Sequence, residues 1–179
     1  MRAGYHPRRQ GDLGELSAME WLVSRGARLY VPIFHSPDVD VVADFDGQLV
    51  SVQVKTCGFL LRGRWQVSLV TRGGNQSWTG IVKHFGPERA DYLFVHVADG
   101  RRWFIPATEL AGGTGISLGG PKYAAFEVEP GRPFAAASDV RAATLDGCSA
   151  GFPSGQRGAA VNRMARPSQV RILPPPLSR

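Results

Sequence analysis

The sequence has 179 residues, of which 43% are hydrophobic and 20% are charged, and its formal net charge is +6 at pH 7. This length fits one domain by the rough guide of ~100–200 residues per domain, and the apolar content is enough for a core. No apolar run approaches the ~18 residues of a membrane span, and two cysteines are too few for a disulfide framework, so we expect a soluble cytoplasmic protein without a membrane partner.

The first predicted element is an amphipathic helix over residues 11–24. Apolar residues recur there at steps of three and four from Leu13 to Val23, and Gly26 marks the end of the pattern. Asp12 can cap the first turn, and acidic side chains are favourable near a helix N-terminus. We therefore expect Glu15 to lie near the helix entrance.

Extended segments follow this helix. Strands are predicted over residues 29–33, 39–45, 49–55, 65–71, 92–98, 103–105 and 124–128, with a short helix over 106–110. Asp46-Gly47 and Asp99-Gly100 are strong hairpin signals between strands, and Pro106 suits the first turn of the short helix. This order predicts an α/β fold with a mixed β-sheet flanked by helices.

The composition changes near residue 148. Residues 1–147 hold 16 Lys or Arg and all 15 Asp and Glu, whereas residues 148–179 hold five Arg, no acid, and many Gly, Pro and Ser. We predict one folded domain over residues 1–147 and a disordered tail over 148–179. Codons for residues 169–172 can resemble the T-arm of a transfer RNA gene, so we add the hypothesis that the reading frame runs into such a gene. A nucleotide sequence without a cloverleaf there would end it.

Three residues of one predicted hairpin have the chemistry that phosphodiester hydrolysis needs, which is oxygen ligands for a divalent cation and a positive group. Side chains alternate along a strand, so Gln53 and Lys55 share a face, and the Asp46-Gly47 turn brings Asp40 beside them. An acid between valines and a lysine on an apolar strand are costly unless they share a partner or face water. A metal cleft explains the pattern, and a half-exposed hairpin with an Asp40–Lys55 salt bridge explains it equally well.

Three motifs resemble those of the PD-(D/E)xK nuclease superfamily. They are Gly14-Glu15 in the helix, Pro37-Asp38-Val39-Asp40 on one strand, and Gln53-Val54-Lys55 on the next. Within the superfamily, the sequence is most similar to the group I intron-associated homing endonucleases, which have glutamine in place of the usual acid, and more distantly to Holliday junction resolvases. The resemblance covers roughly residues 9–128 and implies a restriction-endonuclease-like core.

The resemblance also implies a Mg²⁺-dependent DNA endonuclease of the homing or mobile-element type, with Mn²⁺ as a substitute ion. It makes Asp40 the principal metal ligand, with Asp38 as the alternative. The remaining roles fall on Glu15 and Gln53 as further metal ligands, on the backbone carbonyl of Val54 in the same shell, and on Lys55 to position the attacking water or steady the phosphorane.

Gln53 departs from the usual superfamily pattern. An amide oxygen is a neutral ligand, which weakens metal affinity relative to a carboxylate. A catalytically inactive module that binds nucleic acid is therefore an alternative. A Holliday junction resolvase or a restriction-type nuclease is another, because either would use the same residues on a different DNA substrate.

Basic residues in predicted loops and strand ends are candidates for contacts with DNA phosphates, namely Arg8, Arg9, Arg62, Arg64, Arg72 and Lys83. The residues from Asn75 to Trp78 lie in a Gly-rich loop and suit base edges or stacking, although a buried Trp78 is the competing interpretation. One compact subunit meets one strand of double-stranded DNA at a time, so duplex cleavage predicts a homo-oligomer, either a dimer or a tetramer.

Overall fold

The computed structural model describes residues 7–34, 38–72, 82–110, 113–134 and 141–143. The chain divides into two units, Met1–Leu145 and Asp146–Arg179, and every described residue belongs to the first. The predicted tail over 148–179 and the predicted base contacts from Asn75 to Trp78 lie outside the described residues. The domain boundary near residue 148 stays a prediction.

The described residues form a mixed α/β fold, which confirms the predicted class. The elements in chain order are α1 (Pro7–Ser24), β1 (Arg28–Tyr30), β2 (Val41–Phe45), β3 (Gln48–Cys57), β4 (Phe59–Leu61), β5 (Arg64–Ser68), β6 (Val70–Arg72), β7 (Val82–His84), β8 (Tyr92–Val97), β9 (Arg102–Pro106), the 3₁₀ helix η1 (Ala107–Leu110), β10 (Gly115–Leu118), the 3₁₀ helix η2 (Pro121–Phe126), β11 (Glu127–Val128) and β12 (Arg141–Ala143).

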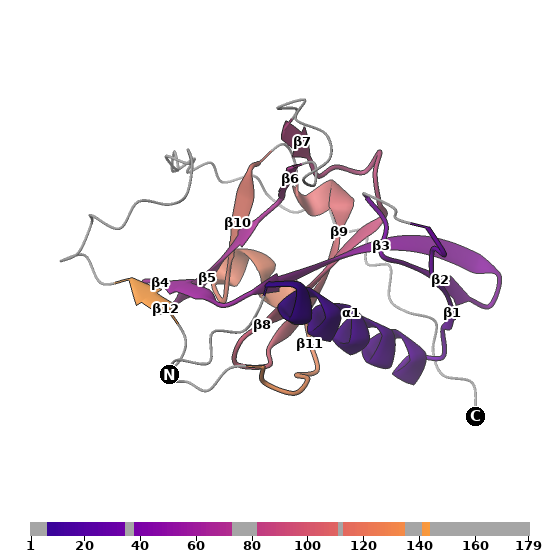
Figure 1. The fold of residues 1–179 in the computed structure, drawn as a ribbon, viewed down its shortest axis with the longest axis horizontal. Coiled ribbons are helices and arrows are strands. Elements are labelled where there is room, and N and C mark those ends of the chain that lie inside the picture. Colours follow the sequence, from indigo (N-terminus) through magenta and orange to yellow (C-terminus); the bar gives the residue numbers. More distant parts are fainter. Residues whose placement is uncertain (1–6, 35–37, 73–81, 111–112, 135–140, 144–179) are drawn as a thin grey trace. The chain divides into compact units, whose positions relative to one another are not determined.

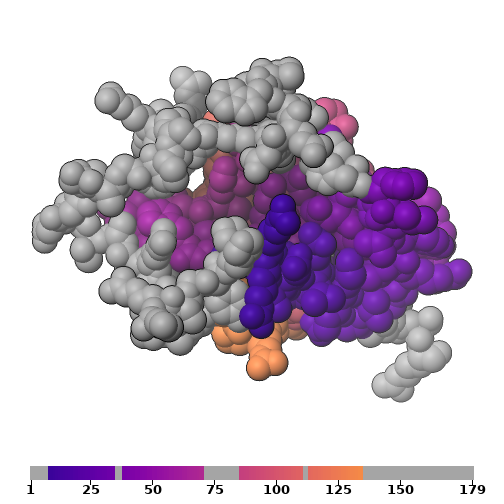
Figure 2. Space-filling model, in the orientation of Figure 1, coloured from indigo at the N-terminus to yellow at the C-terminus, as the bar shows by residue number. Residues whose placement is uncertain are grey.

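A six-stranded sheet forms the centre of this unit, in the order β1-β2-β3-β8-β9-β11 (Figure 1). The pair β3 and β8 is parallel and the other pairs are antiparallel, so the sheet is mixed as predicted. The second sheet has the order β10-β5-β4-β12, and β6 pairs with β7. Helix α1 lies across one face of the large sheet, and its side chains form part of the surface shown in Figure 2.

Helix α1 begins at Pro7, four residues before the predicted start. Proline suits a first helical turn because its fixed φ matches the helix and its missing N–H would have no partner there. Asp12 therefore lies inside the helix, and Glu15 lies roughly two turns from its start. The expectations of an Asp12 cap and of Glu15 at the entrance were wrong. The end at Gly26 was predicted well, since this glycine has φ +86°.

The hairpin predicted between β2 and β3 is present. Asp46 and Gly47 have φ of 51° and 95°, and the N–H of Gly47 donates to Oδ1 of Asp44 at 2.6 Å. Two positive φ angles match the right-handed twist of the flanking strands, and Asp-Gly reaches them at low cost. This turn fixes the β2–β3 register, in which Val41 pairs with Val52.

Several short elements differ from the prediction. The predicted strand over 65–71 is divided into β5 and β6, and most of the predicted strand over 124–128 belongs to η2. Pro121 begins η2 because a proline at the first position favours a helical turn over a strand. The helix predicted over 106–110 is the 3₁₀ helix η1. The strands β4, β7, β10 and β12 were not predicted, since three or four residues give too little alternation to detect.

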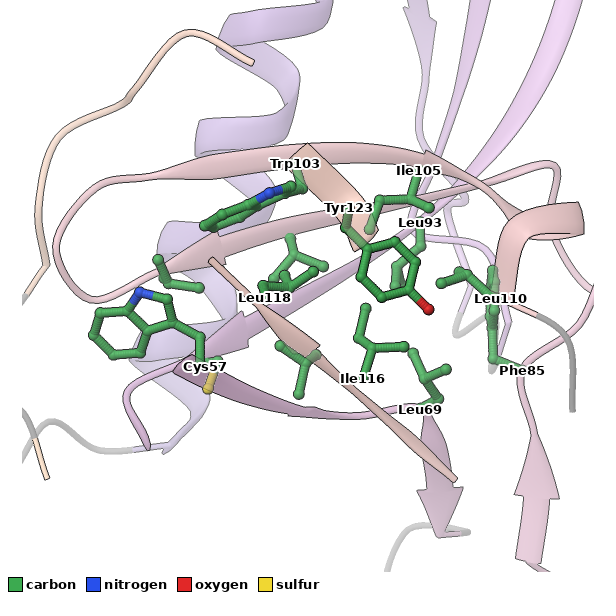
Figure 3. Close-up of a cluster of buried hydrophobic side chains, with 14 of the residues drawn as sticks. Cys57, Leu69, Phe85, Leu93, Trp103, Ile105, Leu110, Ile116, Leu118 and Tyr123 are labelled. Carbon is green, nitrogen blue, oxygen red and sulfur yellow. The ribbon is translucent and has the colours of Figure 1, made fainter. Parts of the chain in front are cut away.

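Two hydrophobic clusters cover the two faces of the large sheet. On one face, Ala18, Trp21 and Leu22 of α1 pack with Val52 and Phe94. On the opposite face, Figure 3 shows side chains of β8 and β9 packed with those of β10 and η2. Within the described ranges, short strands and the 3₁₀ helices η1 and η2 cover this second face, and α1 is the α-helix that flanks the sheet.

Candidate active site

Strand β3 extends beyond the end of its neighbour β2. The last β2–β3 pair joins Val41 to Val52, and β3 continues to Cys57 beside β8. At this point the N–H of Asp40 donates to the carbonyl of Val52 at 3.0 Å. The N–H of Val54 donates to Oδ2 of Asp40 at 2.6 Å. The carboxylate of Asp40 therefore accepts the Val54 N–H that a backbone carbonyl would accept if the β2–β3 pairing continued.

The side chains of β3 alternate about this junction, as predicted. Val52 belongs to the cluster under α1, whereas Gln53 and Lys55 pair with Leu93 and Val95 of the opposite cluster. Cross-strand partners share a face of the sheet, so Gln53 and Lys55 point away from α1. Gln53 is only 4% exposed, and its Oε1 has no hydrogen-bond partner among the described residues.

Glu15 approaches the junction from the other face. Its neighbour Gly14 packs so closely on β3 that an added Cβ would lie 2.2 Å from Cγ2 of Thr56. Only glycine permits this approach, which holds the half-buried Glu15 near the start of β2. Burial raises the pKa of Glu15, and the negative charges of Asp40 and Asp12 raise it further. Glu15 and Asp40 are therefore close enough to repel each other.

Lys55 lies close enough to Asp40 and Asp38 to be affected by their charges. Burial lowers the pKa of its half-buried ammonium group, and the charges of Asp40 and Asp38 oppose this shift. The structure thus brings Glu15, Asp40 and Lys55 together beside the buried amide of Gln53. These four residues are the ones that the sequence motifs singled out.

Asp38 has a partner that sequence reasoning missed. Nη1 of Arg89 donates to Oδ1 of Asp38 at 2.7 Å, across 51 residues of sequence. Arg89 lies in a turn that belongs to no motif of the site. No local pattern in the sequence points to this contact.

The donors present fit a hard divalent cation. Glu15 and Asp40 supply carboxylate oxygens and Gln53 supplies an amide oxygen, which are the ligand types that Mg²⁺ and Ca²⁺ prefer. The unpartnered Oε1 of Gln53 is a buried acceptor that a cation would satisfy. Within the described ranges, no group of three or more His, Cys, Asp or Glu is placed to hold a metal ion. A cation here would therefore depend on the amide and on backbone or water oxygens.

Four of the predicted DNA contacts are exposed. Arg8 and Arg9 lie in the first turn of α1, Arg62 in the β4–β5 turn and Arg64 at the start of β5. Arg72 and Lys83 lie on β6 and β7, and their side chains are not described. Among the described elements, no helix is long and apolar enough to cross a membrane.

Comparison with known proteins adds two findings. The sequence model of the PD-(D/E)XK endonuclease family matches residues 5–117, which is more than half of the chain and includes all four site residues. Among solved structures, the bacterial homing endonuclease I-Ssp6803I has a similar fold, with a TM-score of 0.58 and 18% identity over 69% of this chain and 89% of that one. No curated protein sequence matched the chain.

Proposed function

The chain belongs to the PD-(D/E)XK endonuclease family, and from that premise we propose that Glu15, Asp40, Gln53 and Lys55 form a metal-dependent centre that cleaves DNA. The observation that carries the proposal is the 2.6 Å hydrogen bond from the N–H of Val54 to Asp40. It joins the acid before β2 to the strand that bears the amide and the lysine. Hydrolysis of a phosphodiester needs that combination of groups at one point.

Each residue has a role that its surroundings support. Asp40, Glu15 and Gln53 would hold Mg²⁺, or Mn²⁺ in its place, with the carbonyl of Val54 in the same shell. The ion, when bound, would polarise the scissile phosphate and lower the pKa of a bound water. Burial and then repulsion from Asp40 raise the pKa of Glu15, and a cation between Glu15 and Asp40 would offset the repulsion.

Lys55 would act on the phosphate itself. Its ammonium group is half-buried, where a positive charge stabilises a developing negative charge more strongly than it does in water. It would also orient the attacking water by a hydrogen bond. The exposed Arg8, Arg9, Arg62 and Arg64 would hold the DNA backbone, together with Arg72 and Lys83.

The finer assignment is a homing-type enzyme of a mobile element. The fold likeness to I-Ssp6803I and the glutamine at position 53 favour it. Double-stranded DNA would be the substrate, and a homo-oligomer, a dimer or tetramer, would supply one centre for each strand. We place the protein in the cytoplasm as part of the same proposal.

The test is cleavage of plasmid and linear DNA with Mg²⁺ or Mn²⁺ by the wild type, Asp40→Ala and Lys55→Ala. Glu109→Ala and Lys122→Ala are matched controls, because they remove the same charges at exposed positions. We expect cleavage to disappear in the first two variants and persist in the controls. Intact DNA, with binding that needs no metal, would instead establish a nucleic-acid-binding module. Branched DNA cut in preference to linear DNA would establish the resolvase alternative.

A further inference from the structure

Asp38 and Arg89 form an ion pair at the border of the candidate site. The atoms Oδ1 of Asp38 and Nη1 of Arg89 are 2.7 Å apart, and the two side chains are only 27% and 25% exposed. Nε of Arg89 lies 3.5 Å from a carboxylate oxygen of Glu88, whose side chain is 67% exposed. Asp38 is thus both the nearer and the more buried of the two acids.

The ion pair connects segments that enter different strands. Asp38 lies three residues before β2, Arg89 lies three residues before β8, and these strands are the two neighbours of β3. The segment after Arg89 is itself fixed to β3, because the N–H of Asp91 donates to the carbonyl of Ser51 at 3.0 Å and the N–H of Ser51 donates to Oδ2 of Asp91 at 2.8 Å. The Asp38–Arg89 contact therefore joins the start of β2 to a segment already held by β3.

Both partners have a chain neighbour in the same core. Val39 and Ala90 pack in the cluster on the face of the sheet that carries Gln53, and Ala90 is 2% exposed. Partial burial strengthens an ion pair, and loss of one partner leaves the other charge poorly solvated. The geometry is that of a fixed contact, in contrast to an exposed pair between two long side chains.

We propose that Arg89 is a positioning residue, which binds Asp38 and thereby fixes Asp40, two residues later, against Val54. The inference rests on the proposed function and assigns different roles to the two acids. Oδ1 of Asp38 accepts from the guanidinium of Arg89, and Oδ2 of Asp40 accepts from the backbone N–H of Val54 at the end of the ladder. Asp40 is then the metal ligand, and Asp38 acts through its position in the chain.

The first test needs neither metal nor DNA. Unfolding of the metal-free protein is measured for Asp38→Asn, Arg89→Gln and the double variant. We expect each single change to lower the melting temperature, and the double variant to melt no lower than either single one, because the contact is lost only once. Arg101→Gln is the matched control, since it breaks the Arg101–Glu127 ion pair, also at 2.7 Å, at the opposite end of β8. Additive effects of Asp38→Asn and Arg89→Gln would overturn the inference.

The second test is calorimetric titration of the same proteins with Mg²⁺ or Mn²⁺ alone. Residues that orient a ligand typically change metal affinity ~10–100-fold, so we expect Asp38→Asn and Arg89→Gln each to weaken binding about tenfold. Asp40→Asn should abolish binding, Arg89→Lys should recover most of the affinity, and Arg101→Gln should leave it unchanged. Loss of binding in Asp38→Asn together with normal or tighter binding in Arg89→Gln would make Asp38 the ligand and overturn the inference.

Charge reversal gives an independent check. The double variant Asp38→Arg with Arg89→Asp restores opposite charges at the same positions, so DNA cleavage should exceed that of either single reversal. A double variant that cleaves no better than the more active single reversal would contradict the positioning role. A wild type that neither binds metal nor cuts DNA would refute the proposed function, whereas the metal-free coupling would still report on the ion pair. An active wild type without that coupling would refute the positioning role alone.

Discussion

Helix α1 contacts two polar clusters that are satisfied to very different degrees. Near the middle of the helix, Arg102 is 3% exposed and each of its guanidinium nitrogens has an acceptor. Nε donates to the carbonyl of Glu129 at 2.6 Å, Nη1 donates to Oε2 of Glu20 at 2.5 Å, and Nη2 donates to the carbonyl of Pro130 at 3.3 Å. In the candidate site, Gln53 is similarly buried, and its Oε1 has no such partner among the described residues.

The difference distinguishes the structural cluster around Arg102 from the candidate site around Gln53. Arg102 holds α1 to the segment after β11, and each of its three guanidinium nitrogens donates to an acceptor within the protein. Around Gln53, burial disfavours the charged forms of the ionisable groups, since it raises the pKa of Glu15, as do the neighbouring acids Asp40 and Asp12, and lowers the pKa of Lys55. A buried acceptor without a hydrogen-bond partner and ionisable groups with shifted pKa values are typical of a site that binds an ion or a substrate. Four variants test this comparison.

The largest expected effect is on folding, at Arg102. Arg102→Met keeps much of the side-chain volume and leaves several acceptors without a donor. We expect the free energy of unfolding to fall by roughly 3 kcal/mol, the scale of breaking a buried charge network. Denaturant titration measures this loss, and DNA cleavage per folded molecule should be unchanged. A loss below about 1 kcal/mol would show that the cluster contributes less than its hydrogen bonds imply.

The second variant changes the distance between α1 and the site. Gly14→Ala would place a methyl group 2.2 Å from Cγ2 of Thr56, so we expect a cost of about 1–3 kcal/mol in unfolding free energy. Thr56→Ser removes that Cγ2 and should recover most of the loss when combined with Gly14→Ala. Gly11→Ala is the matched control in the same helix, because its Cβ would meet nothing within 4 Å. The control should gain ~0.5–1 kcal/mol from helix propensity. Equal effects at both glycines would argue against a close approach.

The third variant removes the unpartnered amide. Gln53→Leu keeps the volume and deletes an acceptor without a partner, so stability should stay constant or rise by up to about 1 kcal/mol. DNA cleavage and affinity for Mg²⁺ should both be lost. Gln66→Leu is the control, since the Gln66 amide accepts from Ser117 at 2.8 Å and donates to the Arg64 carbonyl at 3.2 Å. It should lower stability by about 1 kcal/mol and leave cleavage unchanged. A large stability loss in Gln53→Leu would place Gln53 with the structural cluster.

The smallest effect concerns pH. Hydrogen bonds from Trp21 and Arg25 lower the pKa of Glu129 from 4.5 to about 2. A carboxyl group with a lowered pKa stabilises the fold above pH 4.5, and this contribution disappears as the pH falls towards about 2. The side chain is 60% exposed, so solvent screening keeps the effect below about 1 kcal/mol. Melting curves across this range should show a shallower acid loss for Glu129→Gln. An unchanged dependence of the melting temperature on pH would show that the Glu129 carboxylate does not stabilise the fold in this way.

The β-strand part of the site could be predicted from the sequence because its determinants are local. Asp46-Gly47 identifies the turn, and alternation along β3 then places Gln53 and Lys55 on one face. The position of Asp40 near Gln53 and Lys55 then follows from the number of residues in the hairpin. Local rules suffice when the residues that meet are joined by one tight turn.

The rest of the fold, and the surroundings of the candidate site, depend on contacts between distant segments. Arg102 meets Ser17 across 85 residues, and Arg89 meets Asp38 across 51. An arginine in a strand or a turn looks the same in a sequence whether it is solvated or buried. The start of α1 at Pro7 was missed for another reason, since the apolar periodicity that revealed the helix begins only at Leu13.

The length of the two-residue turn between β2 and β3 determines which residue lies opposite Gln53. Because side chains alternate with a period of two along each strand, this length also determines whether an acid or an apolar residue lies beside the amide. One residue inserted at Asp46-Gly47, with the strands shifting to compensate, would bring Val39 or Val41 into the place of Asp40. Selection for cleavage would then remove length changes in this exposed turn as firmly as changes in the core. Mutant libraries that seek a new DNA specificity should keep its length and vary the surfaces around it.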